Sequence, residues 1–178
     1  MMRLMSSSVI EESVAVLRRT PAVLDALLRD LPEVWVHATE GEGTWSPFVV
    51  LGHLVHCEKV DWIPRLEMVL QYGRERTFAP VDREAQFRDS ADKSMASLLD
   101  EFASLRRENV ARLLGMNLGA EDFDREGMHP ALGPVTLRNL LTAWTAHDLA
   151  HTVQVTRVMA RRYRGDVGPF ASFLSVMR

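Results

Sequence analysis

The sequence lacks the features that mark secreted, membrane and nucleic-acid-binding proteins. Its 178 residues include one cysteine, Cys57, which excludes an intramolecular disulfide and leads us to expect a cytoplasmic location. No apolar run reaches the length of about 18 residues that a membrane-spanning helix needs, so we expect no membrane association. The first residues lack the apolar stretch and cleavage pattern of a signal peptide, and we expect none.

An excess of charge of one sign is also lacking. The chain carries 21 Lys and Arg residues against 24 Asp and Glu residues, which gives a formal net charge of −3. Proteins that bind nucleic acids present basic patches or stripes, so we expect no nucleic-acid partner. The hydrophobic content of 47% and the charged content of 25% are ordinary for a soluble globular protein. The length suits one domain, which we assign to residues 1–178.

What the sequence does contain is helical periodicity. Apolar residues recur at steps of three and four along most of the chain, the spacing of one face of an α-helix. Pro21 should break the first helix, with Thr20 as an N-cap, and Pro64 should kink the second. Ser46 and Thr136 suit the N-caps of the second and fourth helices. The pattern predicts four long helices, over residues 8–28, 47–72, 90–116 and 137–164.

The connections between these helices are polar and rich in glycine and proline. Residues 34–43 and 74–89 are predicted as loops, and residues 115–133 as a crossover loop with a short extended piece at 123–126. The Gly-Pro pair at 168–169 should open a short final helical piece. Four long helices with little or no sheet bury their apolar faces against one another. The fold class is therefore all-α, a four-helix bundle with a short C-terminal helical extension.

Two histidines lie four residues apart on the last long helix, one turn above each other on the same face. In that geometry the Cβ atoms of His147 and His151 are roughly 5–6 Å apart, so their imidazoles can meet at one metal ion. They share the apolar stripe of the helix, which includes Leu140, Trp144, Val155 and Val158. A pair of hydrogen-bonded core histidines would produce the same pattern. A metal site and a buried histidine pair therefore both remain open.

A catalytic zinc site typically takes three protein ligands, so a third ligand is needed. His53 lies on the apolar stripe of the second helix, whereas His56 is rotated from it by about 60°, which favours His53. Cys57, one turn from His53, could be a ligand or a nucleophile, but a lone cysteine on an apolar stripe is more often core packing. The histidines of the loops, His37 and His129, are expected at the surface.

Charged residues near these histidines are poorly placed as ligands. Asp148 is rotated by about 100° from His147, and Glu58 by about 140° from His53. We expect Glu58 either to bond to a neighbouring helix or to hydrogen-bond to a metal-ligating side chain and fix its orientation. A further charged group on the third helix has the pattern of a solvated face; it comprises Arg106, Arg107, Arg112, Glu101 and Glu108. Four aromatic residues are candidate pocket walls or core residues: Trp45, Trp62, Trp144 and Phe48.

Several short motifs occur together in one order, and that order resembles a known family. They are Trp45-Ser46-Pro47, Gly52-His53-Leu54 with Glu58, Arg106, the stretch from Met128-His129-Pro130 to Gly133-Pro134-Val135-Thr136-Leu137, and His147-x-x-x-His151 with Gln154. From about residue 9 to residue 159 the chain is similar to the DinB-like (DinB/YfiT) superfamily of metal-dependent enzymes. The resemblance implies an up-down-down-up bundle in which one histidine of the second helix and two of the last hold a divalent ion.

By position, the resemblance gives the metal ligands as His53, His147 and His151. His56 and Cys57 fall outside the family pattern and leave a variant ligand set open. Imidazole ligands suit zinc, nickel, iron or copper, and we expect zinc or nickel. The resemblance also implies a homodimer, and an S-transferase or isomerase that uses a low-molecular-weight thiol on a small-molecule electrophile. Two alternatives remain: a metal-dependent hydrolase, and a non-catalytic metal- or ligand-binding stress-response bundle.

Overall fold

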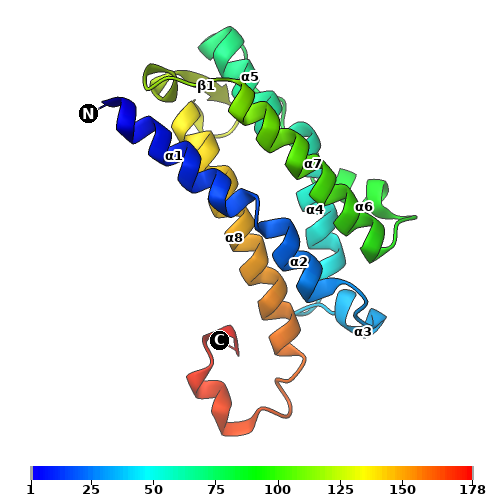
Figure 1. Ribbon diagram of the computed structural model, residues 1–178. Coiled ribbons are helices and arrows are strands. Elements are labelled where there is room, and N and C mark those ends of the chain that lie inside the picture. The colour runs from blue at the N-terminus through cyan, green and yellow to red at the C-terminus, as the bar shows by residue number, and fades with distance from the viewer. Residues whose placement is uncertain (1, 178) are drawn as a thin grey trace.

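Four helical rods form a bundle in the computed structural model, which describes residues 2–177, with side chains from residue 9 onward (Figure 1). The rods are α1 (Met2–Leu17) with α2 (Thr20–Leu28), α4 (Pro47–Val60) with α5 (Trp62–Tyr72), α7 (Met95–Gly115), and α8 (Leu137–Arg161). The first and fourth rods run in one direction and the second and third in the other (Figure 1). This confirms the expected up-down-down-up four-helix bundle.

The connection between the second and third rods is long and runs back along the bundle (Figure 1). After α5, a turn η1 (Gly73–Glu75) reverses the chain, which then reaches α6 (Ala85–Ser90) beside α4. On the way, the backbone N–H of Phe78 donates to Met128 O at 2.9 Å, which ties this connection to the segment after the third rod. A stretch predicted as a loop therefore contains a helix, α6, that packs on the second rod.

Short elements occupy the remaining connections. A helical turn, α3 (Glu33–Val36), lies within the loop before the second rod. The third rod is followed by η2 (Glu121–Asp124) and by an antiparallel hairpin of β1 (Glu126–His129) and β2 (Gly133–Thr136). The predicted extended piece at 123–126 is therefore misplaced, because the chain first makes a helical turn that buries Phe123. The expected C-terminal extension consists of η3 (Gly168–Phe173) and η4 (Ser175–Met177), and η4 contacts α8.

The predicted helix starts and breaks agree with the structure in part, although α1 begins at Met2 rather than residue 8 and α8 ends at Arg161 rather than residue 164. Ser46 and Thr136 cap their helices, each accepting the backbone N–H three residues on, at 3.3 and 3.1 Å. The first rod breaks beside Pro21 and the second between Val60 and Trp62, as the prolines indicate. Thr20, however, does not cap α2, since its hydroxyl donates back to a carbonyl four residues earlier. The third rod starts at Met95 rather than residue 90, because residues 85–90 form α6.

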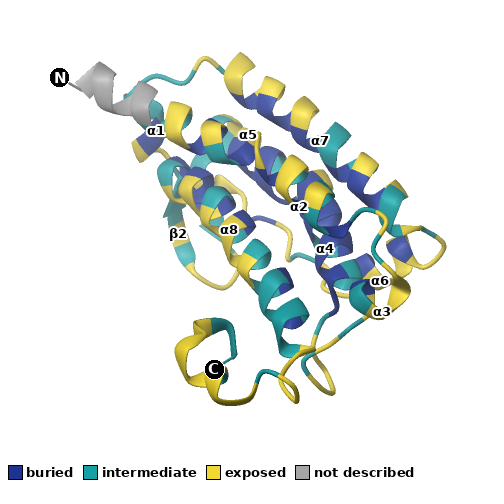
Figure 2. Cartoon of the chain, turned by 60° about the horizontal axis from the view of Figure 1, so that its bottom comes forward, coloured by how far each residue is buried: buried dark blue, intermediate teal, exposed yellow. Residues whose placement is uncertain are grey.

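Buried apolar side chains fill the bundle as two clusters placed one beyond the other along its length. One cluster lies toward the hairpin and includes Phe123 and Trp144. The other lies toward α6 and includes Leu54 and Phe102. The buried faces of the helices turn inward, while the C-terminal extension is largely exposed (Figure 2). No helix within residues 2–177 is both long and apolar enough to cross a membrane.

A buried arginine lies where the two clusters meet. Arg106 of α7 is 1% exposed and is stacked near the rings of Phe102 and Trp144. Its guanidinium donates to Asp148 of α8 at 2.5 and 3.0 Å and to Glu58 of α4 at 2.7 and 3.2 Å. A further N–H donates to the carbonyl oxygen at the end of α1, Leu17 O, at 2.8 Å. One side chain thus bonds to all three other rods.

The Glu58 carboxylate is the second centre of this network. Trp144 Nε1 donates to its Oε1 and Asn109 Nδ2 to its Oε2, both at 3.0 Å. The prediction that Arg106 belongs to a solvated face is therefore wrong, whereas its neighbours Arg107, Glu108 and Arg112 are exposed as expected. Glu58 does pair helices, as the sequence suggests. Buried charges of this kind are tolerated only when each has its partner.

Replacing Arg106 by methionine should lower the free energy of unfolding by about 3–5 kcal/mol, because two buried carboxylates then lose their counter-charge. Urea denaturation followed by circular dichroism measures this loss. Arg107→Met is the matched control on the adjacent, exposed residue, and it should change stability by no more than about 0.5 kcal/mol. A loss below about 1 kcal/mol for Arg106→Met would show that the rods do not depend on the ion pair.

Candidate metal centre

Three imidazole rings from two rods meet inside the bundle. His53 comes from α4, and His147 and His151 come from successive turns of α8. His147 Nε2 lies 3.1 Å from His53 Nε2 and 3.1 Å from His151 Nε2. The candidate ligand atoms of the three residues all lie within 4.8 Å of one another. The structure therefore brings together the three histidines that the sequence and the family resemblance single out.

Close packing of α6 on α4 orients the first of these rings. Gly52 makes the approach possible, since a Cβ at this position would lie 2.5 Å from Ser90 Oγ. Helix α6 thereby presents Gln86, which is buried beside His53. The His53 Nδ1–H donates to Gln86 Oε1 at 2.9 Å. The glycine next to the histidine is thus part of what fixes the direction of the ring.

His151 is oriented in the same way from its own helix. Its Nδ1–H donates to Gln154 Oε1 at 2.8 Å. Because an amide oxygen can only accept, both His53 and His151 carry their proton on Nδ1 and present a lone pair at Nε2. The Nδ1 atom of His147 is buried without a hydrogen-bond partner in the part of the chain described, so its neighbours do not fix its tautomer.

Burial keeps the three rings uncharged. Desolvation, with a smaller effect of the neighbouring His151, lowers the pKa of His53 to about 4. Desolvation, reinforced by His151 and His53, lowers the pKa of His147 to about 3, and burial also lowers the pKa of His151. All three imidazoles are therefore neutral near pH 7, which is the form that binds a metal.

The three Nε2 atoms are better placed to bind a divalent cation than to hydrogen-bond to one another. With lone pairs fixed at His53 and His151, His147 has one Nε2 proton at most and can satisfy one of them. An ion bound by imidazoles at 2.0–2.1 Å with tetrahedral angles sets the nitrogens roughly 3.3 Å apart. The two Nε2 separations of 3.1 Å are close to that value. The residues present therefore fit a three-histidine metal site, and their donor type suits zinc, nickel, iron or copper.

The three rings open onto a cavity of about 480 Å³. Trp45 lies over them, with its ring centroid 5.1 Å from that of His53 and 6.3 Å from that of His151. The second rod supplies the side wall, with Cys57, Asp61 and Arg65 following His53 at intervals of four residues. The connection at residues 80–83 and the hairpin tip at residues 129–131 form the rest of the wall.

The other residues weighed from the sequence stay outside the cluster. His56 is buried, neither of its ring nitrogens has a hydrogen-bond partner among the described residues, and the Asp89 carboxylate is 3.8 Å away. His37 is exposed, as expected. Cys57 Sγ lies 3.6 Å from His53 Nε2 but does not join the three-histidine group. Burial, with the nearby Asp61 and Glu58 carboxylates, raises the pKa of this thiol.

The aromatic candidates divide between the cavity and the core. Trp45 is a cavity wall, whereas Trp62 and Trp144 are buried in the core cluster near the hairpin. Trp62 still reaches the site, because its ring meets His147 edge-on at 5.1 Å between centroids. Phe48 packs against the other core cluster.

Sequence reasoning missed part of the cavity wall. His129, expected at the surface, lies at the hairpin tip and lines the cavity. Its place in the motif Met128-His129-Pro130 is the signal that could have identified it. Asp61 and Arg65 were also missed, although they continue the four-residue spacing of His53 and Cys57 along the second rod. These side chains add charge and hydrogen-bond donors to the cavity wall.

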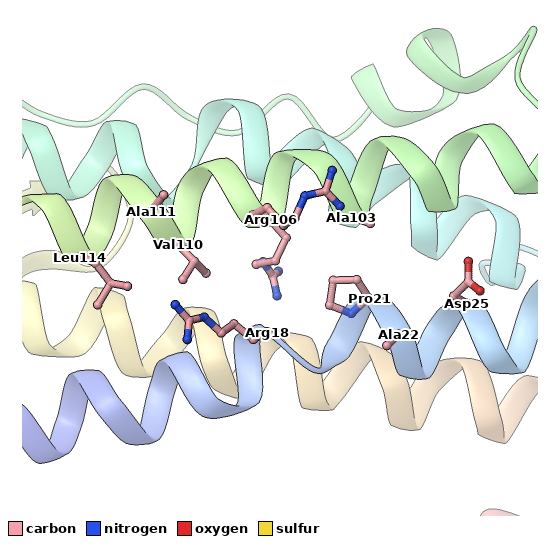
Figure 3. A pocket seen from close by; sticks show the side chains of 10 residues that line it. Arg18, Pro21, Ala22, Asp25, Ala103, Arg106, Val110, Ala111 and Leu114 are labelled. Atoms are coloured by element: carbon pink, nitrogen blue, oxygen red, sulfur yellow. The ribbon is translucent and has the colours of Figure 1, made fainter.

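A second hollow, of about 700 Å³, lies between the first rod and α7 (Figure 3). Its walls are largely apolar and include Pro21, Val110 and Leu114. Arg106 borders it, but this side chain is already bound to the buried carboxylates. Size alone therefore does not identify the site of chemistry, and the polar groups converge at the smaller histidine cavity.

Comparison with known proteins places this architecture in a family. The model of the DinB superfamily matches residues 17–166. Among solved structures, the chain is similar to YfiT from Bacillus subtilis, with 22% sequence identity, a TM-score of 0.75, and coverage of 86% of this chain and 87% of that chain. YfiT is described as a probable metal-dependent hydrolase with an unusual four-helix bundle topology. A search of the curated proteins finds no match. Since the family model covers most of its length, the chain belongs to the DinB superfamily.

Proposed function

We propose that this protein is a metal-dependent enzyme in which His53, His147 and His151 hold one zinc or nickel ion. The observation that carries the proposal is the convergence of the Nε2 atoms of three neutral imidazoles. Two of these atoms, in His53 and His151, are unprotonated because the ring proton is on Nδ1, where it is donated to a glutamine oxygen. The printed description of YfiT as a probable metal-dependent hydrolase supports a metal in this fold. Within residues 2–177 no further His, Cys, Asp or Glu joins the group, which leaves a coordination position for a substrate.

We further propose that the substrate at that position is a low-molecular-weight thiol, and that the enzyme is an S-transferase or isomerase. A bound divalent ion supplies the chemistry by lowering the pKa of a coordinated thiol or water, so that either becomes a nucleophile near neutral pH. The chain's own thiol is a poor nucleophile, because Cys57 is 1% exposed and packed against His53. The reacting thiol therefore enters through the cavity, whose 480 Å³ suits a small molecule.

The protein's own residues position and shield the reacting groups. Gln86 and Gln154 hold the rings of His53 and His151 so that both Nε2 atoms face the same point. Trp45 lies across these two rings and limits the access of water from that side. Excluding water strengthens the electrostatic interactions inside the site and limits competing hydrolysis.

Two other functions are consistent with the same cluster. A metal-dependent hydrolase is favoured by the description of YfiT, and it would use a coordinated water in place of the thiol. A non-catalytic metal- or ligand-binding bundle is disfavoured by the cavity, since a structural ion is normally enclosed by four protein ligands. The need for an added thiol separates the transferase from the hydrolase. The homodimer and the cytoplasmic location expected from the sequence stay predictions.

Elemental analysis of the purified protein should find about one divalent ion per chain. His147→Ala should abolish metal binding, because two histidines cannot hold the ion alone, while His37→Ala, at an exposed residue directly after α3, should retain it. His53→Ala should also lose the ion, and His56→Ala should keep it. Loss of the metal in His56→Ala with retention in His53→Ala would mean that the third ligand is wrongly identified.

The glutamine contacts give a second test. Gln86→Leu should weaken metal affinity by about 10–100-fold, since the His53 ring loses the partner that fixes its tautomer and direction. Competition with a coloured chelator measures the affinity. Gln71→Leu, an exposed glutamine on α5, is the control and should bind the metal as tightly as the unmodified protein. Equal affinities for Gln86→Leu and the unmodified protein would argue against the proposed orientation of the ring.

A reaction screen tests the chemistry. With an activated aryl halide as the electrophile, the metal-loaded protein should form the thioether only when a small thiol is added, with halide as the leaving group. The rate should fall by about 100-fold or more in His147→Ala, because the nucleophile is no longer activated by the ion. Hydrolysis of a nitrophenyl ester without added thiol, together with no thioether formation, would replace the transferase by the hydrolase.

A further inference from the structure

Outside the histidine triad, the charged and imidazole side chains of the cavity wall are mostly hydrogen-bond donors. They are Arg65 from the second rod, Arg83 from the returning connection and His129 from the hairpin tip. Among the described residues that line the cavity, the one carboxylate is that of Asp61, and it is already ion-paired with Arg65 at 2.7 Å. A polar ligand in this cavity must therefore bring acceptors of its own.

The hydrogen bonds of His129 show which of its nitrogens is available as a donor. His129 Nδ1 accepts the backbone N–H groups of Ala131 and Leu132, both at 3.2 Å. With Nδ1 used as an acceptor, the ring proton is on Nε2. The ring is also held against the edge of Phe78, with 6.4 Å between ring centroids. His129 therefore offers one N–H donor in a fixed position on the cavity wall.

The two arginines differ in what they leave free. Arg65 is buried, and its guanidinium is held by Asp61 and by Ala79 O at 3.2 Å. This arrangement makes Arg65 a rigid donor whose charge is largely cancelled. Arg83 is exposed at the cavity and makes no ion pair within the chain from residue 9 to residue 177. Among the described residues of the cavity wall, Arg83 thus carries the one uncompensated positive charge.

From this arrangement we infer that the substrate bound at the metal is a small molecule that carries a carboxylate, and that Arg83 with His129 binds this carboxylate at the cavity wall. The inference rests on the proposed function, and it adds the class of substrate. An arginine and a neutral donor that line one cavity are suited to a carboxylate, which offers two acceptor oxygens. A neutral ligand would leave the Arg83 charge without a partner at the cavity wall.

Calorimetric titration of the metal-loaded protein with mercaptopropionate and with its amide tests the inference. The two thiols differ only in the charged group, so the carboxylate should bind about tenfold more tightly or better. In Arg83→Gln that preference should disappear, while the affinity for the amide stays the same. Arg107→Gln removes the same charge from an exposed position on α7, outside this cavity, and should keep the preference.

Each contrary result points to a different failure. Equal affinities for the two thiols in the unmodified protein would overturn the carboxylate site and leave the metal–thiol proposal intact. Binding of neither thiol would overturn the thiol proposal. In that case glutarate, which has no thiol, tests the carboxylate site by itself. Glutarate should bind the metal-free unmodified protein about tenfold more tightly than metal-free Arg83→Gln. Equal binding, or none to either, would overturn the site.

Discussion

The buried guanidinium of Arg106 is the constraint on which the rest of the structure depends. It joins the end of α1 to Glu58 of α4 and Asp148 of α8, between the two apolar clusters. Asp148 directly follows a candidate ligand, His147, and Glu58 lies on the same helix as His53. The network therefore sets the register of the two helices, and the imidazoles of both helices come to lie at the same level. A buried ion pair thus helps to align the candidate metal ligands.

Much of the fold and the histidine cluster could be predicted because the signals are local. His147 and His151 share one face of one helix, and the caps at Ser46 and Thr136 depend on residues three positions away. Arg106 could not be recognised in this way, because its carboxylate partners are 48 and 42 residues distant in the sequence. On its own helix it looks like the exposed arginines beside it. Whether a charge is buried depends on which other helices come to face it.

The cavity wall shows the same limit. His129 looks like an ordinary loop histidine until the hairpin folds over the ends of the rods. The hairpin is held there by the returning connection, through the bond from the Phe78 N–H to Met128 O. Gly127 makes the contact close, since a Cβ at that position would lie 2.5 Å from the Phe78 ring. Contacts between two irregular segments have no periodic signature in either segment, which explains why this half of the site was missed.

The two halves of the cavity therefore come from different kinds of structure. The triad is carried by helices whose register is fixed by a buried ion pair, whereas Arg83 and His129 are carried by segments outside the rods. Loops tolerate replacement and changes of length far better than packed helices do. Such a division allows descendants of one ancestral bundle to exchange the segments outside the rods for new ligands without rebuilding the histidine cluster. Diversification of ligand specificity across a lineage then needs no change in the rods themselves.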